Sequence, residues 1–171
     1  MLIVSVDVDY RDDLAVAAAV CFRGWSATEV EHTAVLAFRD VAPYKPGEFY
    51  KRELPCLLGV LGRVPRADVV VVDGYVWLDQ GRAGLGAHLH AALHQTIVIG
   101  VAKTRYAGAT GAAAICRGRS RVPLYVTAAG VDFAQATRWI QEMHGPHRIS
   151  TMLKYADRLA RTATPSTDDR R

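Results

Sequence analysis

Hydrophobic residues near the start of the chain fall into short blocks rich in β-branched side chains, a pattern typical of buried strands. The first block is Leu2–Val8, and we expect two further strands over Leu14–Phe22 and Glu31–Phe38, joined by turn residues around Gly24. Alanine is a poor strand former, so the alanine-rich stretch Ala15–Ala19 also fits a helix. The pattern therefore predicts three successive strands, the second of them with a helical alternative.

Further along the chain, strand-like blocks alternate with segments of helical spacing. The clearest strand is Val69–Val72, four consecutive valines that run into Asp73. Pro55 should break the helix in which it lies or begin a second one, and Pro123 predicts that the strand after it lies at a sheet edge. Gly108–Gly118, rich in glycine and alanine, predicts a loop and a weak edge strand. The other expected elements are helices over Glu48–Leu61, Gly84–His94, Val131–His144 and Thr151–Arg161, and strands over Thr96–Val101 and Val122–Thr127.

This order of elements predicts an α/β domain with a mixed sheet flanked by helices. We find no internal repeat, linker or second domain, and 171 residues suit a single domain. We expect residues 1–161 to form this domain. Residues 162–171 are polar and predict a flexible C-terminal tail.

Composition limits the possible functions without selecting one. Half of the residues are hydrophobic, which excludes a largely disordered chain, and 21 Lys and Arg against 17 Asp and Glu give a net charge of +4. That excess permits a polyanionic partner but does not establish one. Cys21, Cys56 and Cys116 are odd in number and widely scattered, and no C-x-x-C pair occurs, so neither a disulfide framework nor a structural zinc site is indicated. The N-terminus lacks a secretory pattern and no apolar run is long enough to span a bilayer, so we expect a soluble, cytoplasmic protein without a membrane partner.

Two acidic residues at the ends of buried strands are the first candidates for chemistry. Asp7 stands between Val6 and Val8, and Asp73 ends the valine strand. A carboxylate in such surroundings loses hydration unless a cation or hydrogen bonds compensate it. The pair therefore indicates a site for a hard divalent cation, which prefers oxygen ligands. The alternative is that each aspartate only caps a turn.

Three further residues and one short segment are ambiguous when each is considered by itself. Glu53 and Asp157 each fit a solvated helix surface, and Lys103, directly after a strand, could meet an anion at the same sheet edge. In Pro43-Tyr44-Lys45-Pro46 an aromatic side chain is held between two prolines and loses little entropy when it stacks. Such a residue can serve as a wedge between bases, or it can pack against a helix of its own domain.

Taken together and in order, these segments resemble the endonuclease V family, which has a ribonuclease H-like fold. No single segment is decisive, but the ordered series is specific and extends from Leu2 to Leu159. The matching segments are Val6–Tyr10, Pro43–Gly47, Phe49–Pro55, Val70–Gly74, Gly84–Leu89, Ile99–Lys103, Pro123–Thr127 and Tyr155–Asp157.

The resemblance implies a function and a set of site residues. The family cleaves DNA or RNA that contains inosine, at the second phosphodiester on the 3′ side, and uses Mg²⁺ or Mn²⁺. By position, the metal-binding acids would be Asp7, Glu53, Asp73 and Asp157, with Lys103 at the phosphate near the cut. The strand-separating wedge would be Pro43, Tyr44, Lys45 and Pro46, with Tyr44 beside the lesion, and the pocket for the flipped base would include Gly47, Gly74 and Leu85. We expect Mg²⁺ or Mn²⁺ as cofactor, inosine-containing nucleic acid as partner and a monomer.

The sequence departs from the family pattern directly after Asp73-Gly74. The family has histidines where this chain has Tyr75 and Asp79, and Val76 adds a side chain where a glycine would let the backbone approach the ligand. Asp79 could supply a fifth carboxylate. The Ser-Pro-Gly-His that usually follows the later strand is Thr127-Ala128-Ala129-Gly130, and the segment between Lys103 and Val122 is short.

These departures leave two other functions open beside an inosine-directed nuclease. One is a relative that binds nucleic acid without cutting it. The other is a metal-dependent enzyme for a small phosphorylated nucleoside or similar ligand. Retention of four acids argues against the first, because buried carboxylates without a counter-charge are costly. The altered aromatic loop keeps the second open.

Overall fold

The computed structural model describes residues 1–11, 14–39, 43, 45, 48–79, 81–94, 96–108 and 111–164. Within these ranges a seven-stranded sheet has the order β3-β2-β1-β4-β7-β9-β8, and a small β5–β6 hairpin stands apart from it. The sheet strands are β1 Leu2–Arg11, β2 Leu14–Arg23, β3 His32–Arg39, β4 Val69–Asp73, β7 Ile97–Ala102, β8 Ala113–Ile115 and β9 Leu124–Ala129. The hairpin strands are β5 Trp77–Asp79 and β6 Arg82–Ala83.

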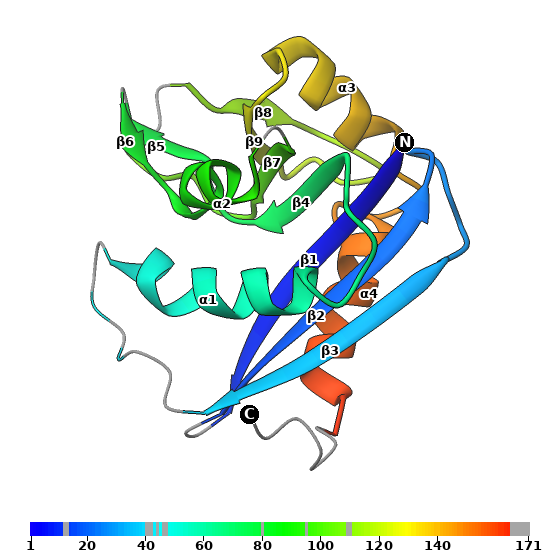
Figure 1. Cartoon of the computed structure of the whole chain (residues 1–171). Coiled ribbons are helices and arrows are strands. Elements are labelled where there is room, and N and C mark those ends of the chain that lie inside the picture. Colours follow the sequence, from blue (N-terminus) through cyan, green and yellow to red (C-terminus); the bar gives the residue numbers. More distant parts are fainter. Residues whose placement is uncertain are drawn as a thin grey trace.

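The strands pair as a mixed sheet, as predicted. β1, β4 and β7 run parallel to one another, whereas β2, β3, β8 and β9 pair antiparallel to their neighbours. β2 pairs with the whole of β1, but β4 pairs with β1 only as far as Val6. The second half of β1, from Asp7 to Arg11, therefore extends past β4, and among the described residues its flank on that side has no strand partner (Figure 1).

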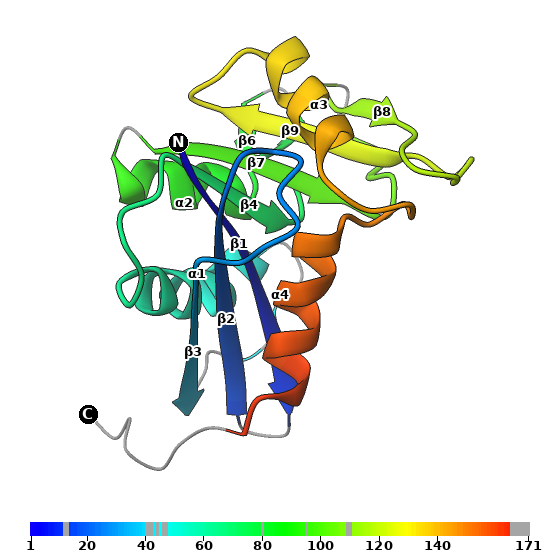
Figure 2. The ribbon, with the colours of Figure 1, turned by 90° about the vertical axis from the view of Figure 1, so that its right-hand side faces the viewer.

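In the part of the chain that the structure describes, four helices cover the two faces of this sheet, two on each face. α1 (Phe49–Leu61) and α2 (Leu85–Leu93) pack on one face. α3 (Phe133–Glu142) and α4 (Thr151–Thr162) pack on the other, where α4 runs alongside β1 and β2 (Figure 2). None of the helices in the described ranges is long and apolar enough to cross a membrane.

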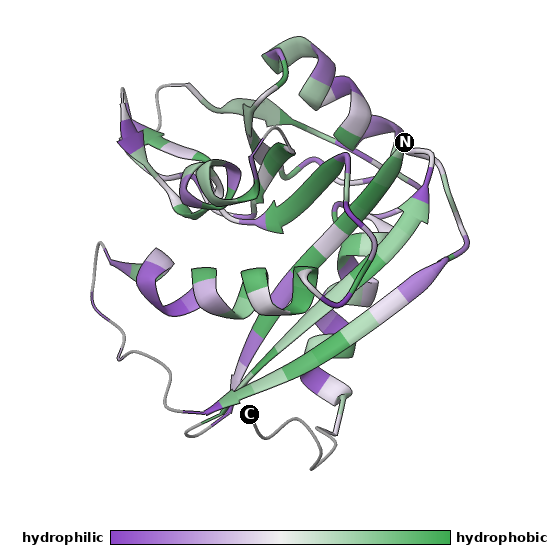
Figure 3. Ribbon diagram, in the orientation of Figure 1, coloured by the Kyte–Doolittle hydropathy of each residue, from purple (hydrophilic) through white to green (hydrophobic). Residues whose placement is uncertain are grey.

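Strand alternation divides the apolar side chains between two cores, one on each face. In β4, Val70 and Val72 belong to the core under α1 and α2, whereas Val69 and Val71 belong to the core under α3 and α4. Successive side chains point to opposite faces of a strand. β4 is accordingly apolar on both faces up to Asp73 (Figure 3), and within a strand the parity of a residue determines which pair of helices it faces.

The element order is confirmed, with corrections at two prolines and one loop. The segment Ala15–Ala19 is part of a strand rather than a helix. Pro55 lies inside α1 without interrupting it, because it is on the exposed side of the helix, where water can hydrate the carbonyl of Lys51 left without a donor. Pro123 was expected at a sheet edge, but β9 lies between β7 and β8, and the proline precedes the ladder. The β5–β6 hairpin was not predicted.

Candidate active site

Asp7 and Asp73 lie side by side because of the register between their strands. The last β1–β4 pair is Val6 with Val72, so the two aspartates occupy the next position along each strand. Asp73 shares the parity of Val69 and Val71, and therefore faces the α4 side of the sheet. The structure thus brings together the two acids that were predicted from strand ends alone.

The third acid, Asp157, reaches this point from α4. The side chain of Ser150 caps the start of the helix by accepting a hydrogen bond from Leu153 N, and the next turns bury Met152, Leu153 and Ala156 against the sheet. Asp157 follows this buried stripe. It lines a cavity of about 210 Å³ whose other lining residues are Val6, Asp7, Asp73, Val101, Lys103, Ile149, Leu153 and Lys154.

The fourth acid, Glu53, comes from the opposite face of the sheet. It lies on the buried side of α1, and only 8% of its surface is exposed. α1 reaches the acids because β4 ends at Asp73 and leaves the flank of β1 open. Glu53 joins Asp7, Asp73 and Asp157 around a second hollow of about 420 Å³, which Tyr10, Phe49, Gly74 and Arg161 also line.

The proximity of these acids changes their proton affinity. Burial, followed by the charges of Asp73 and Asp157, raises the pKa of Asp7 to about 7. Burial, followed by the charges of Asp7 and Asp73, raises the pKa of Glu53 to about 8. Both carboxyls are disfavoured as anions, since the protein does not supply enough positive charge around them. Perturbation of this kind is typical of functional sites.

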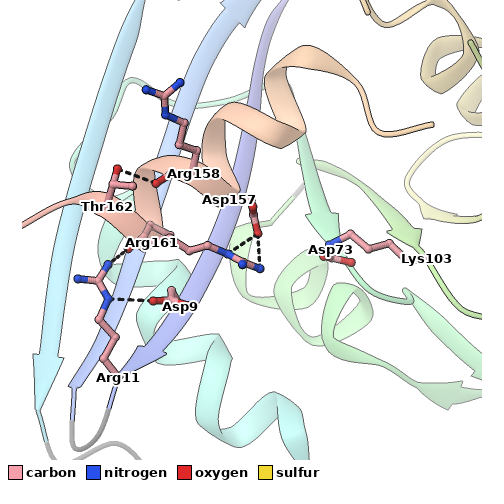
Figure 4. Close-up of polar contacts among 9 residues, drawn as sticks. Asp9, Arg11, Asp73, Lys103, Asp157, Arg158, Arg161 and Thr162 are labelled. Atoms are coloured by element: carbon pink, nitrogen blue, oxygen red, sulfur yellow. Dashed lines mark hydrogen bonds and ion pairs between the residues drawn. The ribbon is translucent and has the colours of Figure 1, made fainter. Parts of the chain in front are cut away.

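Two cationic side chains form ion pairs with two of the four acids, Asp73 and Asp157. The Lys103 ammonium forms an ion pair with Asp73, and the Arg161 guanidinium contacts Asp157 Oδ1 at 3.0 Å (Figure 4). Burial lowers the pKa of Lys103, but its hydrogen bond to Asp73 and the charges of Asp7 and Asp157 outweigh that effect and raise it overall. Lys103 is therefore a fixed positive charge within the cluster.

The donor chemistry of the cluster fits a hard divalent cation. All four acids offer carboxylate oxygens, the ligands that Mg²⁺ and Mn²⁺ prefer, and the raised pKa values of Asp7 and Glu53 mark negative charge that a cation would compensate. Among the described residues, however, no three His, Cys, Asp or Glu side chains stand close enough together to hold an ion. Asp73 and Asp157 are turned toward Lys103 and Arg161 instead.

The other predicted site residues divide into four groups. Gly74 lines the hollow beside the acids and has φ +134°, a conformation that favours glycine, so it turns the chain sharply after β4. Leu85 is buried in the core at the start of α2 and lines neither acidic hollow. Pro43 and Lys45 are exposed. The remaining predicted site residues, Tyr44, Pro46 and Gly47, lie outside the described residues.

The loop after β4 departs from the family pattern without filling the site. Val76 adds a side chain where the family has a glycine, but that side chain is fully buried against Gly86 at the start of α2. The Tyr75 hydroxyl donates to Thr104 O at 2.9 Å and accepts from Tyr106 N at 3.0 Å. Asp79, considered above as a fifth carboxylate, pairs with Arg82 across the hairpin at 3.3 Å and lines neither acidic hollow.

Two residues that contact the loop after β4 or the acid cluster were not predicted as site residues from the sequence. Thr127 accepts a hydrogen bond at its Oγ1 from Val76 N at 2.8 Å, which ties the loop after β4 to β9. Arg161 pairs with Asp157 one helical turn away. The i, i+4 spacing from Asp157 was a usable signal for Arg161. Thr127 had no local signal, since its partner is distant in sequence.

The mixed sheet, the helices on both of its faces and the acidic side chains beside the end of the β1–β4 ladder place this protein in the ribonuclease H-like fold class. Comparison with known families agrees: the model of the family described as Endonuclease V matches residues 1–130. The chain belongs to the endonuclease V family.

Individual relatives resemble the chain over different lengths. Endonuclease V of Streptomyces coelicolor is 40% identical over 108 residues, which cover 61% of this chain and 45% of that protein. That of Rhodospirillum centenum is 31% identical over 69% of this chain and 58% of its own length. These matches thus span about half of each relative. Endonuclease V of Streptomyces avermitilis is 32% identical over 94% of this chain and 80% of its own.

Solved structures support the same fold. The crystal structure of Endonuclease V from Streptomyces avermitilis superposes with a TM-score of 0.79 at 28% identity, covering 94% of this chain and 80% of that chain. Endonuclease V from Ciona intestinalis, in complex with a DNA 24-mer containing an inosine, gives a TM-score of 0.78 at 19% identity over 94% of this chain and 84% of that one.

Proposed function

We propose that this protein is a metal-dependent endonuclease that hydrolyses a phosphodiester 3′ to an inosine in DNA or RNA. One observation supports the proposal: four carboxylates from β1, β4, α1 and α4 line a single hollow, together with Lys103. These acids belong to separate elements and repel one another, so their convergence needs a cation to offset its cost. The inosine target is supported by family membership and by the DNA bound to the Ciona intestinalis relative.

The chemistry expected of each group follows from its position. Asp7, Glu53, Asp73 and Asp157 would hold Mg²⁺ or Mn²⁺, which when bound activates a water and neutralises charge on the phosphate. Lys103 would add fixed positive charge close to the phosphate as its negative charge develops. For Asp73 and Asp157 to bind the ion, their carboxylates have to turn away from Lys103 and Arg161.

The competing function is nucleic-acid binding without cleavage. It is favoured by the ion pairs of Lys103 and Arg161, which already neutralise two of the four acids. In such a protein these pairs would be the permanent arrangement. An added metal would then find no competent site and would leave thermal stability unchanged.

The deciding experiment is incubation of the protein with end-labelled DNA and RNA that carry a single inosine, each with Mg²⁺ and with Mn²⁺. We expect a cut on the 3′ side of inosine and a metal-dependent rise in melting temperature. Matched strands with adenosine in place of inosine should stay intact. No cut together with no thermal shift would overturn the nuclease in favour of the binding protein, and cutting that persists after Asp7→Ala would indicate a contaminant.

A further inference from the structure

A third hollow, which is basic, adjoins the acidic cavity on the α4 side of the sheet. It measures about 400 Å³ and has Ile149 and Lys154 in common with the cavity that contains Asp7 and Asp73. We call it the basic groove; its lining residues are Arg119, Ser120, Pro146, His147, Arg148, Ile149 and Lys154. Because the two hollows share a wall, an extended ligand can occupy both.

A buried arginine, Arg117, holds together the segments that line the groove. Arg117, only 5% exposed, extends from the end of β8 into the loop between α3 and α4. Its guanidinium donates to several carbonyls of that loop, namely those of Met143, Gly145, His147 and Arg148. Buried polar contacts of this kind hold a loop in one conformation.

A backbone contact closes the same junction. Arg119 N donates to Pro146 O at 3.0 Å. The preceding residue, Gly118, has φ +58°, and a Cβ there would lie 2.4 Å from Pro146 O, so a larger residue would force the two segments apart. The turn after β8 and the α3–α4 loop therefore form one unit, on the side of the molecule where α4 begins (Figure 2).

Arg148 connects the groove to the candidate active site. Its side chain donates to Pro123 O and to Lys103 O. The backbone of Lys103 is thereby fixed to the groove, while its ammonium points to Asp73. On α4, Lys154 lies one turn before Asp157, a rise of about 5 Å. Positive charge thus begins within one helical turn of the acids.

The cations of the groove are available to a ligand. Across the described residues, none of Arg119, Arg148 and Lys154 forms an ion pair with a carboxylate. Arg119 and Lys154 are also exposed. Unpaired cations in a preformed hollow attract anions, and a row of them suits the regularly spaced charges of a phosphodiester chain.

We propose that the basic groove binds backbone phosphates of the nucleic-acid strand next to the phosphodiester that is cut. The inference rests on the proposed function and extends it by assigning the path of the strand, from the acids over Lys154 to Arg119. A phosphate contact carries no sequence information, so the groove holds the strand without reading its bases. Selection of inosine then belongs to other parts of the protein.

The test is binding of labelled single-stranded DNA and RNA over a range of salt concentrations, in EDTA so that no strand is cut. Arg119→Gln and Lys154→Gln are compared with Arg138→Gln, which removes the same charge from an exposed position on α3. We expect each groove variant to weaken binding about three- to tenfold and to reduce the slope of log K against log salt by about 0.7. The loss should be equal with and without inosine, whereas Arg138→Gln should bind like the wild type.

Other outcomes separate this inference from the nuclease proposal. Groove variants that match Arg138→Gln, or that lose affinity only for inosine strands, overturn the groove even if the wild type cuts. If the groove variants lose salt slope but the wild type never cuts, the result supports the groove as a phosphate-binding site and rules out the nuclease. Full competition by inorganic phosphate at concentrations that match the strand's own phosphate would overturn it too, since the groove would then be a site for a free anion.

Discussion

The acid cluster and the loop that follows β4 lie next to each other but differ in how their polar groups are satisfied. In the cluster, Glu53 is buried and Asp7 is partly buried near like charges, and their raised pKa values reflect this environment. In the loop, polar groups find partners within the chain: the Tyr75 hydroxyl has two, and Trp77 Nε1 donates to Ala128 O at 3.1 Å.

The difference shows which of the two regions needs a ligand to compensate its charge. A loop whose hydrogen bonds are internal gains stability from them. A cluster of like charges loses stability until a ligand compensates it. Changes in the loop should therefore lower stability, whereas changes in the cluster should abolish metal response and cutting while sparing the fold.

The largest expected effect is that of Asp73→Asn. Loss of one carboxylate from the cluster should lower cutting by at least about a hundredfold, since charge stabilisation by a bound ion contributes several kcal/mol. It should also abolish the Mn²⁺-dependent rise in melting temperature, while the metal-free protein keeps its fold. Gel cleavage assays and thermal unfolding measure the two quantities.

The matched control is Asp79→Asn, which removes the same charge from the β5–β6 hairpin. It should cut and respond to Mn²⁺ as the wild type does. Equal loss in both variants would contradict the assignment of the site to the strand ends.

The next largest effect concerns the anchor of the loop. Thr127→Val leaves the buried Val76 N–H without its acceptor, and should lower the free energy of unfolding by about 1–3 kcal/mol. Thr127→Ser keeps the hydroxyl and should recover most of that loss. Chemical denaturation of the two variants tests this; a larger destabilisation by Thr127→Ser than by Thr127→Val would mean that the methyl group, not the hydrogen bond, stabilises the junction.

The pH dependence of stability should reveal the cluster. In the folded state Asp7 and Glu53 have pKa values of about 7 and about 8, above their ordinary values of 3.8 and 4.5. The folded protein therefore binds more protons than the unfolded chain between about pH 4 and pH 8, and its stability falls as pH rises through that window.

Glu53→Gln removes one of these groups and should flatten the decline in EDTA, raising the melting temperature at pH 8 by a few degrees, at about 2–4 °C per kcal/mol. Melting curves at pH 5 and pH 8 measure it. A wild-type protein that is more stable at pH 8 than at pH 5 without metal would contradict the electrostatics described above.

The smallest effect is expected for Tyr75→Phe. The exposed hydroxyl bridges Thr104 and Tyr106, and its loss should lower the free energy of unfolding by about 1 kcal/mol or less. Urea denaturation gives the value. A loss of several kcal/mol would show that the loop contributes to the core and not only to its own conformation.

Much of the fold could be predicted from local pattern. Blocks such as Val69–Val72 are apolar on both faces, which is the requirement of a strand covered by helices on both sides. The predictions drawn from Pro55 and Pro123 were wrong. A proline on the exposed side of a helix need not break it, and a proline that precedes a strand's hydrogen-bonded ladder does not require that strand to be at a sheet edge. The β5–β6 hairpin has two short strands with little apolar periodicity.

The candidate site was less accessible to local reasoning. Asp7 and Asp73 could be paired because each follows a run of apolar strand residues. Only Asp73 ends its strand, since β1 continues to Arg11, but the β1–β4 ladder stops just before Asp7 and its register makes the two residues neighbours. Glu53 and Asp157 looked like helix surface, and only the family resemblance marked them. The reason is that helix spacing identifies a buried face but not what that face meets.

The open flank of β1 has a consequence for how activity should fail on heating. Glu53 comes from the core under α1, and Asp157 from the core under α4, so the cluster exists only while both helices are docked. The strands within the sheet should exchange their amide hydrogens last, whereas a helix on one face can detach in a local opening. Detachment of α4 would separate Asp157 from Asp73 while leaving the hydrogen bonds of the sheet in place. Cutting should therefore disappear several degrees below the global melting temperature.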